Sequence, residues 1–162
     1  MVDVREVLRG HGMKPAGWIR SGGLCPKKSA CPYIDEIGHV HAHLDFEIEQ
    51  FAVYSFLVGD EVMKNGKAGS QGDTLRGRVQ SEANQINSAW LFLERRPRGN
   101  PAWHKRPLDV FKRLAPSVIR LDQKIEVWAG AFAADEFENK ERELNGLFRR
   151  LQDRLPWVDR DG

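Results

Sequence analysis

The chain has 162 residues, which is enough for one domain with a sizeable core but hardly for two. Hydrophobic residues make up 41% and charged residues 30%, and no apolar run approaches the roughly 18 residues that a membrane helix needs. The formal net charge of +2 does not by itself indicate a nucleic-acid partner, although basic residues gather locally. Because acidic residues stand near the N-terminus where a secretory signal has basic ones, we expect a single-domain cytoplasmic protein with no membrane association.

The first fifty residues predict an extension made of a short helix, loops and one strand. Asp3 can cap a helix that carries apolar residues on one face. Glycine and proline are frequent over residues 10–32, which predicts loops. From Gly38 to Glu49 apolar and polar residues alternate, and this pattern is typical of a half-buried strand.

The rest of the chain carries strand and helix patterns in turn. The expected elements are a β-hairpin over residues 51–63, helices over 73–90 and 107–116, a strand over 124–132 and a helix over 134–155. Glycines over residues 66–72 predict a bend, and Pro116 and Pro156 end helices. This order predicts an α+β fold.

Two short motifs occur in the expected hairpin. Ala52-Val53-Tyr54 lies on its first strand, and Lys64-Asn65-Gly66-Lys67 begins ten residues after Tyr54. The pair resembles the GIY-YIG nuclease superfamily, in which the first motif ends in a tyrosine and the second in a glycine, often followed by lysine. The chain departs from the family in the two residues before Tyr54, and in Lys64, which replaces a tyrosine. Some restriction-enzyme members of the family carry lysine at that position.

Two further matches follow in the order that the family has. Leu75-Arg76-Gly77-Arg78 resembles the segment that places an arginine one turn into the next helix, and Arg78 is the matching residue. The last signature is a glutamate on the C-terminal helix, for which Glu143 is favoured over Glu141. Pro156-Trp157 resembles the end of many members, so the resemblance covers about residues 51–157.

The resemblance implies both a fold and an activity. The fold is a small antiparallel three-stranded GIY-YIG sheet flanked by helices, with an N-terminal strand and loop extension. Residues 1–50 would pack on a nuclease core at 51–157, which holds an inserted helical and basic segment, all in one domain. The activity is metal-dependent hydrolysis of phosphodiester bonds in duplex DNA by a sequence-specific endonuclease, most simply a type II restriction enzyme. A homing or repair nuclease, or a catalytically inactive DNA-binding member, is the alternative.

The family motif assigns four site residues on this chain. Tyr54 would be the general base toward water, and Lys64 the cation that lowers the pKa of that tyrosine. Arg78 would bind the scissile phosphate, whose geometry a guanidinium matches. Glu143 would hold Mg²⁺ or Mn²⁺, which acts as a Lewis acid at the leaving oxygen.

The hairpin register decides whether Tyr54 and Lys64 can act together. Their even separation puts them on one face only if the loop holds an odd number of residues or the strand carries a bulge. We therefore expect Val58 opposite Val62, with Gly59-Asp60-Glu61 as a three-residue loop or an equivalent bulge.

Basic residues other than Lys64 and Arg78 are the candidates for contact with DNA, because arginine and lysine bind phosphates and guanine edges. They are Lys67, Arg76, Arg95, Arg96, Arg98, Lys105 and Arg106. One set of catalytic residues handles one phosphodiester at a time, so cutting both strands predicts a homodimer on double-stranded DNA.

Each of these residues also has a purely structural interpretation. A tyrosine in an apolar strand is usually a core residue, and the lysines, arginines and glutamates are of types most often exposed to solvent. A zinc-dependent hydrolase is a further alternative, since alternation places His39, His41 and His43 on one strand face, downstream of Cys25 and Cys31. That spacing matches no standard zinc motif, and Glu82 and Asn84 receive no role.

Overall fold

The structure, a computed structural model, describes residues 2–23, 39–70, 72–83 and 124–159. Its named elements are α1 (Val4–Gly10), β1 (Lys14–Gly23), β2 (His39–Leu44), β3 (Ala52–Val58), β4 (Glu61–Ala68), β5 (Ile125–Ala131) and α4 (Phe137–Gln152). Residues 75–83 form a further helix. The expected helix over 107–116 lies outside the described residues. No helix in the described part of the chain is long and apolar enough to cross a membrane.

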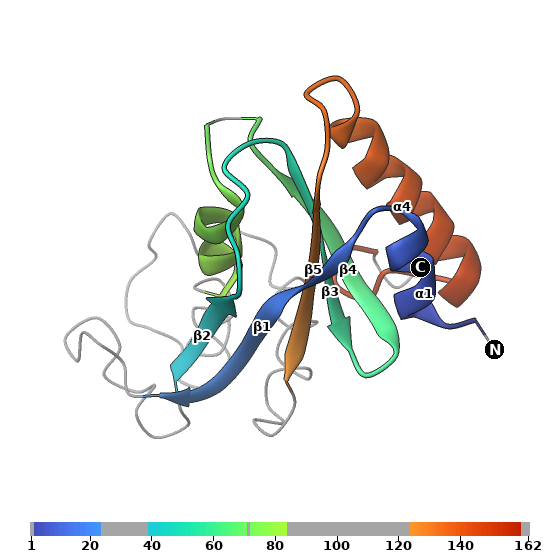
Figure 1. Cartoon of the computed structure of the whole chain (residues 1–162). Helices are drawn as coiled ribbons and strands as arrows, with labels where there is room; N and C mark the ends of the chain where they lie inside the picture. Colours follow the sequence, from blue (N-terminus) through green and yellow to red (C-terminus); the bar gives the residue numbers. More distant parts are fainter. Residues whose placement is uncertain (1, 24–38, 71, 84–123, 160–162) are drawn as a thin grey trace, which may run out of the picture.

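The five strands form an antiparallel sheet in the order β2-β1-β5-β3-β4 (Figure 1). The α+β class is confirmed, but the prediction of three strands is wrong. The difference comes from β2, a strand that was expected in the N-terminal extension and here joins the sheet, and from β1, which lies in a segment whose glycines and prolines predicted loops. In the structure Gly17 is needed because a Cβ there would lie 1.9 Å from the backbone oxygen of His43. Pro15 stands where the β1–β5 register shifts, a place that tolerates its missing N–H.

Each face of the sheet is covered by its own helices (Figure 1). On one face Tyr54 and Phe56 pack with Leu75 and Val79 of the helix over residues 75–83. The opposite face is covered by α1 and α4, whose buried side chains join Val53, Leu57 and Trp128 of the sheet. The strands β3 and β5 are buried on both sides, which explains their nearly continuous apolar sequences.

The β3–β4 hairpin turns through two residues, Gly59 and Asp60, because Val58 pairs with Glu61. The predicted pairing of Val58 with Val62 is therefore wrong. The equivalent bulge is present instead: Leu57 pairs with Val62 and Phe56 with Lys64, which leaves Met63 as an extra residue on β4. Because successive residues of a strand point to opposite faces, the extra residue turns Lys64 to the face of the sheet on which Tyr54 lies.

The C-terminal end of α4 is fixed to the edge strand β4. The Gln152 side chain accepts a hydrogen bond from the backbone nitrogen of Val62 at 3.1 Å and donates one to its oxygen at 2.5 Å. The backbone nitrogen of Trp157 donates to the oxygen of Met63 at 3.1 Å. These contacts hold the helix beside the strand that carries the second motif.

Packing of α4 depends on Leu144, whose side chain has no exposed surface. Leu144→Ala should lower the free energy of unfolding by about 2–5 kcal/mol, because it opens a cavity between helix and sheet. Leu151→Ala is a matched control on the same helix, since Leu151 is 40% exposed and should change stability by less than about 0.5 kcal/mol. Denaturant unfolding measures both, and equal losses would contradict this packing.

Candidate active site

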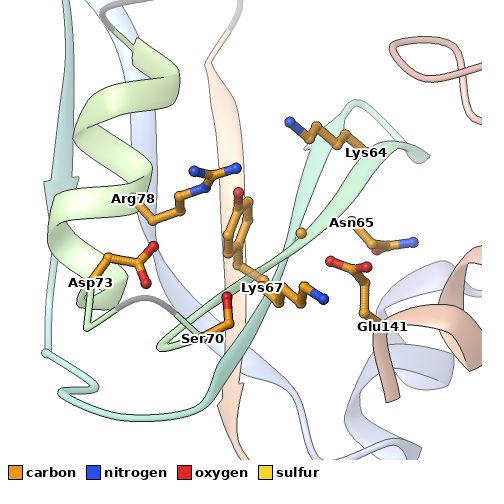
Figure 2. Close-up of a pocket in the computed structure, with 9 residues that line it drawn as sticks. Lys64, Asn65, Lys67, Ser70, Asp73, Arg78 and Glu141 are labelled. Atoms are coloured by element: carbon orange, nitrogen blue, oxygen red, sulfur yellow. The ribbon is translucent and has the colours of Figure 1, made fainter. Parts of the chain in front are cut away.

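A polar pocket of about 240 Å³ lies where β4 passes between the helix over residues 75–83 and α4 (Figure 2). Side chains from both helices and from the hairpin point into it. The lining residues are Tyr54, Lys64, Asn65, Gly66, Lys67, Ser70, Asp73, Arg78 and Glu141. The pocket therefore collects the tyrosine, lysine and arginine that the sequence motifs single out.

Gly66 makes room for the Tyr54 ring, which lies across the edge strand. The two residues are paired in the β3–β4 register. A Cβ at position 66 would lie 2.3 Å from both Cζ and the hydroxyl oxygen of Tyr54, so every larger residue displaces the ring. Glycine is required here by close approach, since its φ is not in the left-handed region.

This close approach predicts the effect of Gly66→Ala. We expect a loss of about 1–3 kcal/mol in the free energy of unfolding, because Tyr54 is fully buried and cannot move without disturbing the core. Gly10→Ala is the control, because a Cβ at Gly10 meets nothing within 4 Å. Thermal unfolding compares the two, and an unchanged Gly66→Ala protein would refute the contact.

Glu82 joins Tyr54 and Lys64 beneath the pocket. Its Oε1 accepts a hydrogen bond from the Tyr54 hydroxyl at 3.2 Å and another from Lys64 Nζ at 2.6 Å. Glu82 is only 7% exposed, so this ion pair is largely removed from water. Sequence reasoning assigned no role to Glu82. A signal was nevertheless present, because Glu82 stands seven residues after Leu75 and falls at the border of the apolar stripe.

The surroundings of Tyr54 keep its hydroxyl protonated. Burial raises the pKa of Tyr54 well above its ordinary value, and the negative charge of Glu82 raises it further. Hydrogen bonding to Arg78 acts in the opposite direction without overcoming them. The structure thus differs from the expectation that Lys64 lowers the Tyr54 pKa, because Lys64 pairs with Glu82.

Arg78 extends into the pocket from the helix over residues 75–83 (Figure 2). Hydrogen bonding to Tyr54 raises the pKa of Arg78, which stays a cation. The start of its helix is held by the segment after β2, since Glu47 Oε1 accepts from the Arg76 nitrogen at 2.9 Å and the Ile48 oxygen from the Leu75 nitrogen at 3.0 Å. The N-terminal part of the chain therefore positions this arginine.

The structure brings Glu141, and not Glu143, to the pocket. Residues two apart on a helix point about 200° from each other. Glu143 faces α1, where its carboxylate lies 3.4 Å from His11 Nδ1 and 3.1 Å from Lys140 Nζ. Glu141 faces β4 (Figure 2), and burial raises its pKa while Lys67 and Lys64 oppose that shift. Glu141 therefore lines the pocket, and the predicted Glu143 lies outside it.

Comparisons with known proteins add little to this geometry. No protein family and no curated protein matches the chain. A solved structure, restriction endonuclease HPY188I in complex with product DNA, aligns with 95% of this chain and 83% of its own, at 10% sequence identity and a TM-score of 0.42. A likeness this low carries no argument about the chemistry of the pocket.

The pocket offers oxygen ligands to a hard divalent cation. The carboxylate of Glu141 makes no hydrogen bond or ion pair within the described part of the chain. Asp73 and Ser70 also line the pocket, and Asp73 Oδ1 accepts from the Gly69 nitrogen at 2.8 Å. No group of three or more histidine, cysteine or acidic residues meets as a metal cage in the described ranges. Such sparse ligation fits Mg²⁺, which retains waters and binds substrate phosphates.

The other predicted residues divide into those that the structure describes and those that it does not. Lys67 lines the pocket and pairs with Glu138 at 3.2 Å, and Arg76 is exposed and pairs with Glu47 at 3.5 Å. His43 Nε2 lies 2.9 Å from Asp45. The remaining DNA-contact and zinc candidates lie outside the described side chains: Arg95, Arg96, Arg98, Lys105, Arg106, Cys25, Cys31, His39 and His41.

Proposed function

We propose that the chain is a metal-dependent DNA endonuclease of the GIY-YIG type, which hydrolyses phosphodiester bonds of duplex DNA. The observation that carries this proposal is the convergence of Tyr54, Arg78 and Glu141, with Lys64 behind them, on one polar pocket. They come from β3, the helix over residues 75–83, α4 and β4, in the chain order of the family motif. Four separate elements supply a proton acceptor, two cations and a metal ligand.

The cations prepare the pocket for a phosphodiester. Arg78 remains charged and reaches the pocket with a planar guanidinium, which can donate two hydrogen bonds to one phosphate. Lys67 of β4 lines the same pocket and would add positive charge near the DNA backbone. Together they stabilise the extra negative charge that develops on the phosphoryl oxygens.

The carboxylate of Glu141 would hold Mg²⁺ or Mn²⁺. This assigns to Glu141 the role that the sequence motif assigned to Glu143. When bound, the metal supplies a Lewis acid at the leaving oxygen. Tyr54 is the residue that removes a proton from the attacking water, because it lines the pocket and its hydroxyl lies between Arg78 and Glu82.

We further propose that cutting is sequence specific, as in a type II restriction enzyme, and that two subunits each cut one strand. The basic residues between positions 95 and 106 are the candidates for reading base edges. The described residues contain one tyrosine–arginine–glutamate set, which favours a homodimer on a two-fold symmetric site. A homing or repair nuclease would instead produce mainly nicks.

Mixed-sequence duplex DNA tests the proposal. Incubation with Mg²⁺ should give fragments with 5′-phosphate ends at one recurring sequence, read by sequencing the ends, and chelation should stop the reaction. Retention of DNA without any cutting would instead indicate the inactive DNA-binding alternative. Activity that survives Tyr54→Phe but is lost in His41→Ala would indicate the zinc hydrolase.

A further inference from the structure

One carboxylate oxygen, Oε1 of Glu82, receives two hydrogen bonds. The Tyr54 hydroxyl donates to it at 3.2 Å and Lys64 Nζ at 2.6 Å. Since a phenol has one proton, the Tyr54 proton is already directed away from the pocket toward Glu82. Arg78 donates to one lone pair of the Tyr54 hydroxyl oxygen, and the other lone pair is available to a proton donor in the pocket that Tyr54 lines.

The direction of the Tyr54 hydroxyl proton matters because the surroundings of Tyr54 do not stabilise a phenolate. Burial and the charge of Glu82 raise its pKa more than hydrogen bonding to Arg78 lowers it, and Lys64 is paired with Glu82. A neutral phenol is a poor base in water. It can accept a proton only as it gives up its own, and Glu82 is placed to take it.

We propose that Glu82 is the proton acceptor behind Tyr54, so that the two residues form a relay from the attacking water to the buried carboxylate. The inference rests on the proposed nuclease function and assigns Glu82 a role in that reaction. Glu82 acts through Tyr54 and does not touch the DNA, which makes it a positioning and proton-accepting residue.

The relay conserves protons and electrons. As an O–H bond of water breaks, its proton forms a bond to Tyr54 Oη while the proton already on Oη passes to Glu82 Oε1. The oxygen of the resulting hydroxide forms the new bond to phosphorus, and the bond from phosphorus to the 3′ oxygen breaks. The leaving oxygen takes a proton from solvent, and Glu82 returns its proton to solvent after the products leave.

Charged groups from two elements surround the pair. Lys64 from β4 pairs with the Glu82 carboxylate, and Arg78 from the same helix acts on both Tyr54 and Glu82. Asp73 is the remaining titratable group that acts on Arg78. Two cations therefore flank one carboxylate and one phenol, and they compensate the single negative charge that Glu82 carries before the proton reaches it.

The tyrosine count allows a direct spectroscopic test. The chain has two tyrosines, Tyr33 and Tyr54, so Tyr33→Phe leaves Tyr54 as the only one. With isotope-labelled tyrosine, nuclear magnetic resonance follows its protonation during a pH titration of the full chain. We expect a neutral phenol throughout the neutral range, and a lower Tyr54 pKa in Glu82→Gln, where Lys64 and Arg78 are no longer balanced. A phenolate at neutral pH in the parent protein would overturn the relay.

Cleavage kinetics give the second readout. Glu82→Gln keeps a hydrogen-bond acceptor but loses the basic carboxylate, so single-turnover cutting should slow by about 10²–10⁴-fold with unchanged DNA affinity. Glu82→Asp, which retains a carboxylate on a shorter side chain, should recover part of that loss, and it replaces Glu82→Gln if the latter does not fold. Parent-like cutting by Glu82→Gln would overturn the relay. A parent chain that cuts no DNA but shows the Glu82-dependent titration would contradict the proposed function alone.

Discussion

Tyr54→Phe should slow DNA cleavage by about 10²–10⁴-fold, the range that a general base contributes. The change removes only the hydroxyl that donates to Glu82, and the ring that packs against Gly66 and Phe56 remains. Because Lys64 still pairs with Glu82, no buried charge is left alone, and the free energy of unfolding should fall by no more than about 1.5 kcal/mol. Single-turnover cleavage under saturating protein measures the effect.

Tyr33→Phe is the matched control, because it makes the same chemical change at the only other tyrosine of the sequence. It should leave the cleavage rate unchanged. Cleavage activity that survives Tyr54→Phe would contradict the catalytic role. The complete burial of Tyr54 would then reflect a core residue.

Glu141→Gln should lower metal-dependent cleavage at least about a hundredfold, since a Lewis acid at the leaving oxygen contributes several kcal/mol to the barrier. Glu141 faces the pocket and has no ion pair in the described ranges, so its loss should weaken Mg²⁺ binding without disturbing another contact. Cleavage measured against Mg²⁺ concentration separates the two effects, because weaker binding shifts the midpoint of the curve.

Glu143→Gln provides the control on the same helix, two residues away. Its carboxylate pairs with Lys140 and lies near His11, outside the pocket, and exposed pairs of this kind contribute little. We expect cleavage by Glu143→Gln within about twofold of the parent rate. If Glu143→Gln is inactive and Glu141→Gln cuts normally, the orientation of α4 described here is wrong.

The sequence predicts the periodic elements well because their apolar spacing reflects which face is buried. The strand with alternating residues before Leu44, the hairpin around Gly59 and the C-terminal helix containing Leu144 all occur in the structure. The strand β1 could not be predicted, because Gly17 is there for a contact with the backbone of His43, which is distant in sequence. Composition alone makes such a segment look like a loop.

The residue types of the site could be predicted from the sequence, but the directions in which their side chains point could not. Tyr54, Lys64 and Arg78 occur in motif order and meet in the pocket. Choosing between Glu141 and Glu143 requires the rotation of α4 about its own axis, which packing of Leu144 and Phe148 determines. The partner of Tyr54 also depends on packing, since Glu82 belongs to a mostly apolar helix face that only the sheet defines.

Cleavage in isotopically labelled water tests the central claim most directly. Duplex DNA containing a cut site is incubated with the protein and Mg²⁺ in water enriched in heavy oxygen, and the fragments are weighed by mass spectrometry. We predict one labelled oxygen on the new 5′-phosphate, no label on the 3′-hydroxyl, and no fragments when Mg²⁺ is chelated. Intact DNA, or cutting that is indifferent to chelation, would contradict metal-dependent hydrolysis at this pocket.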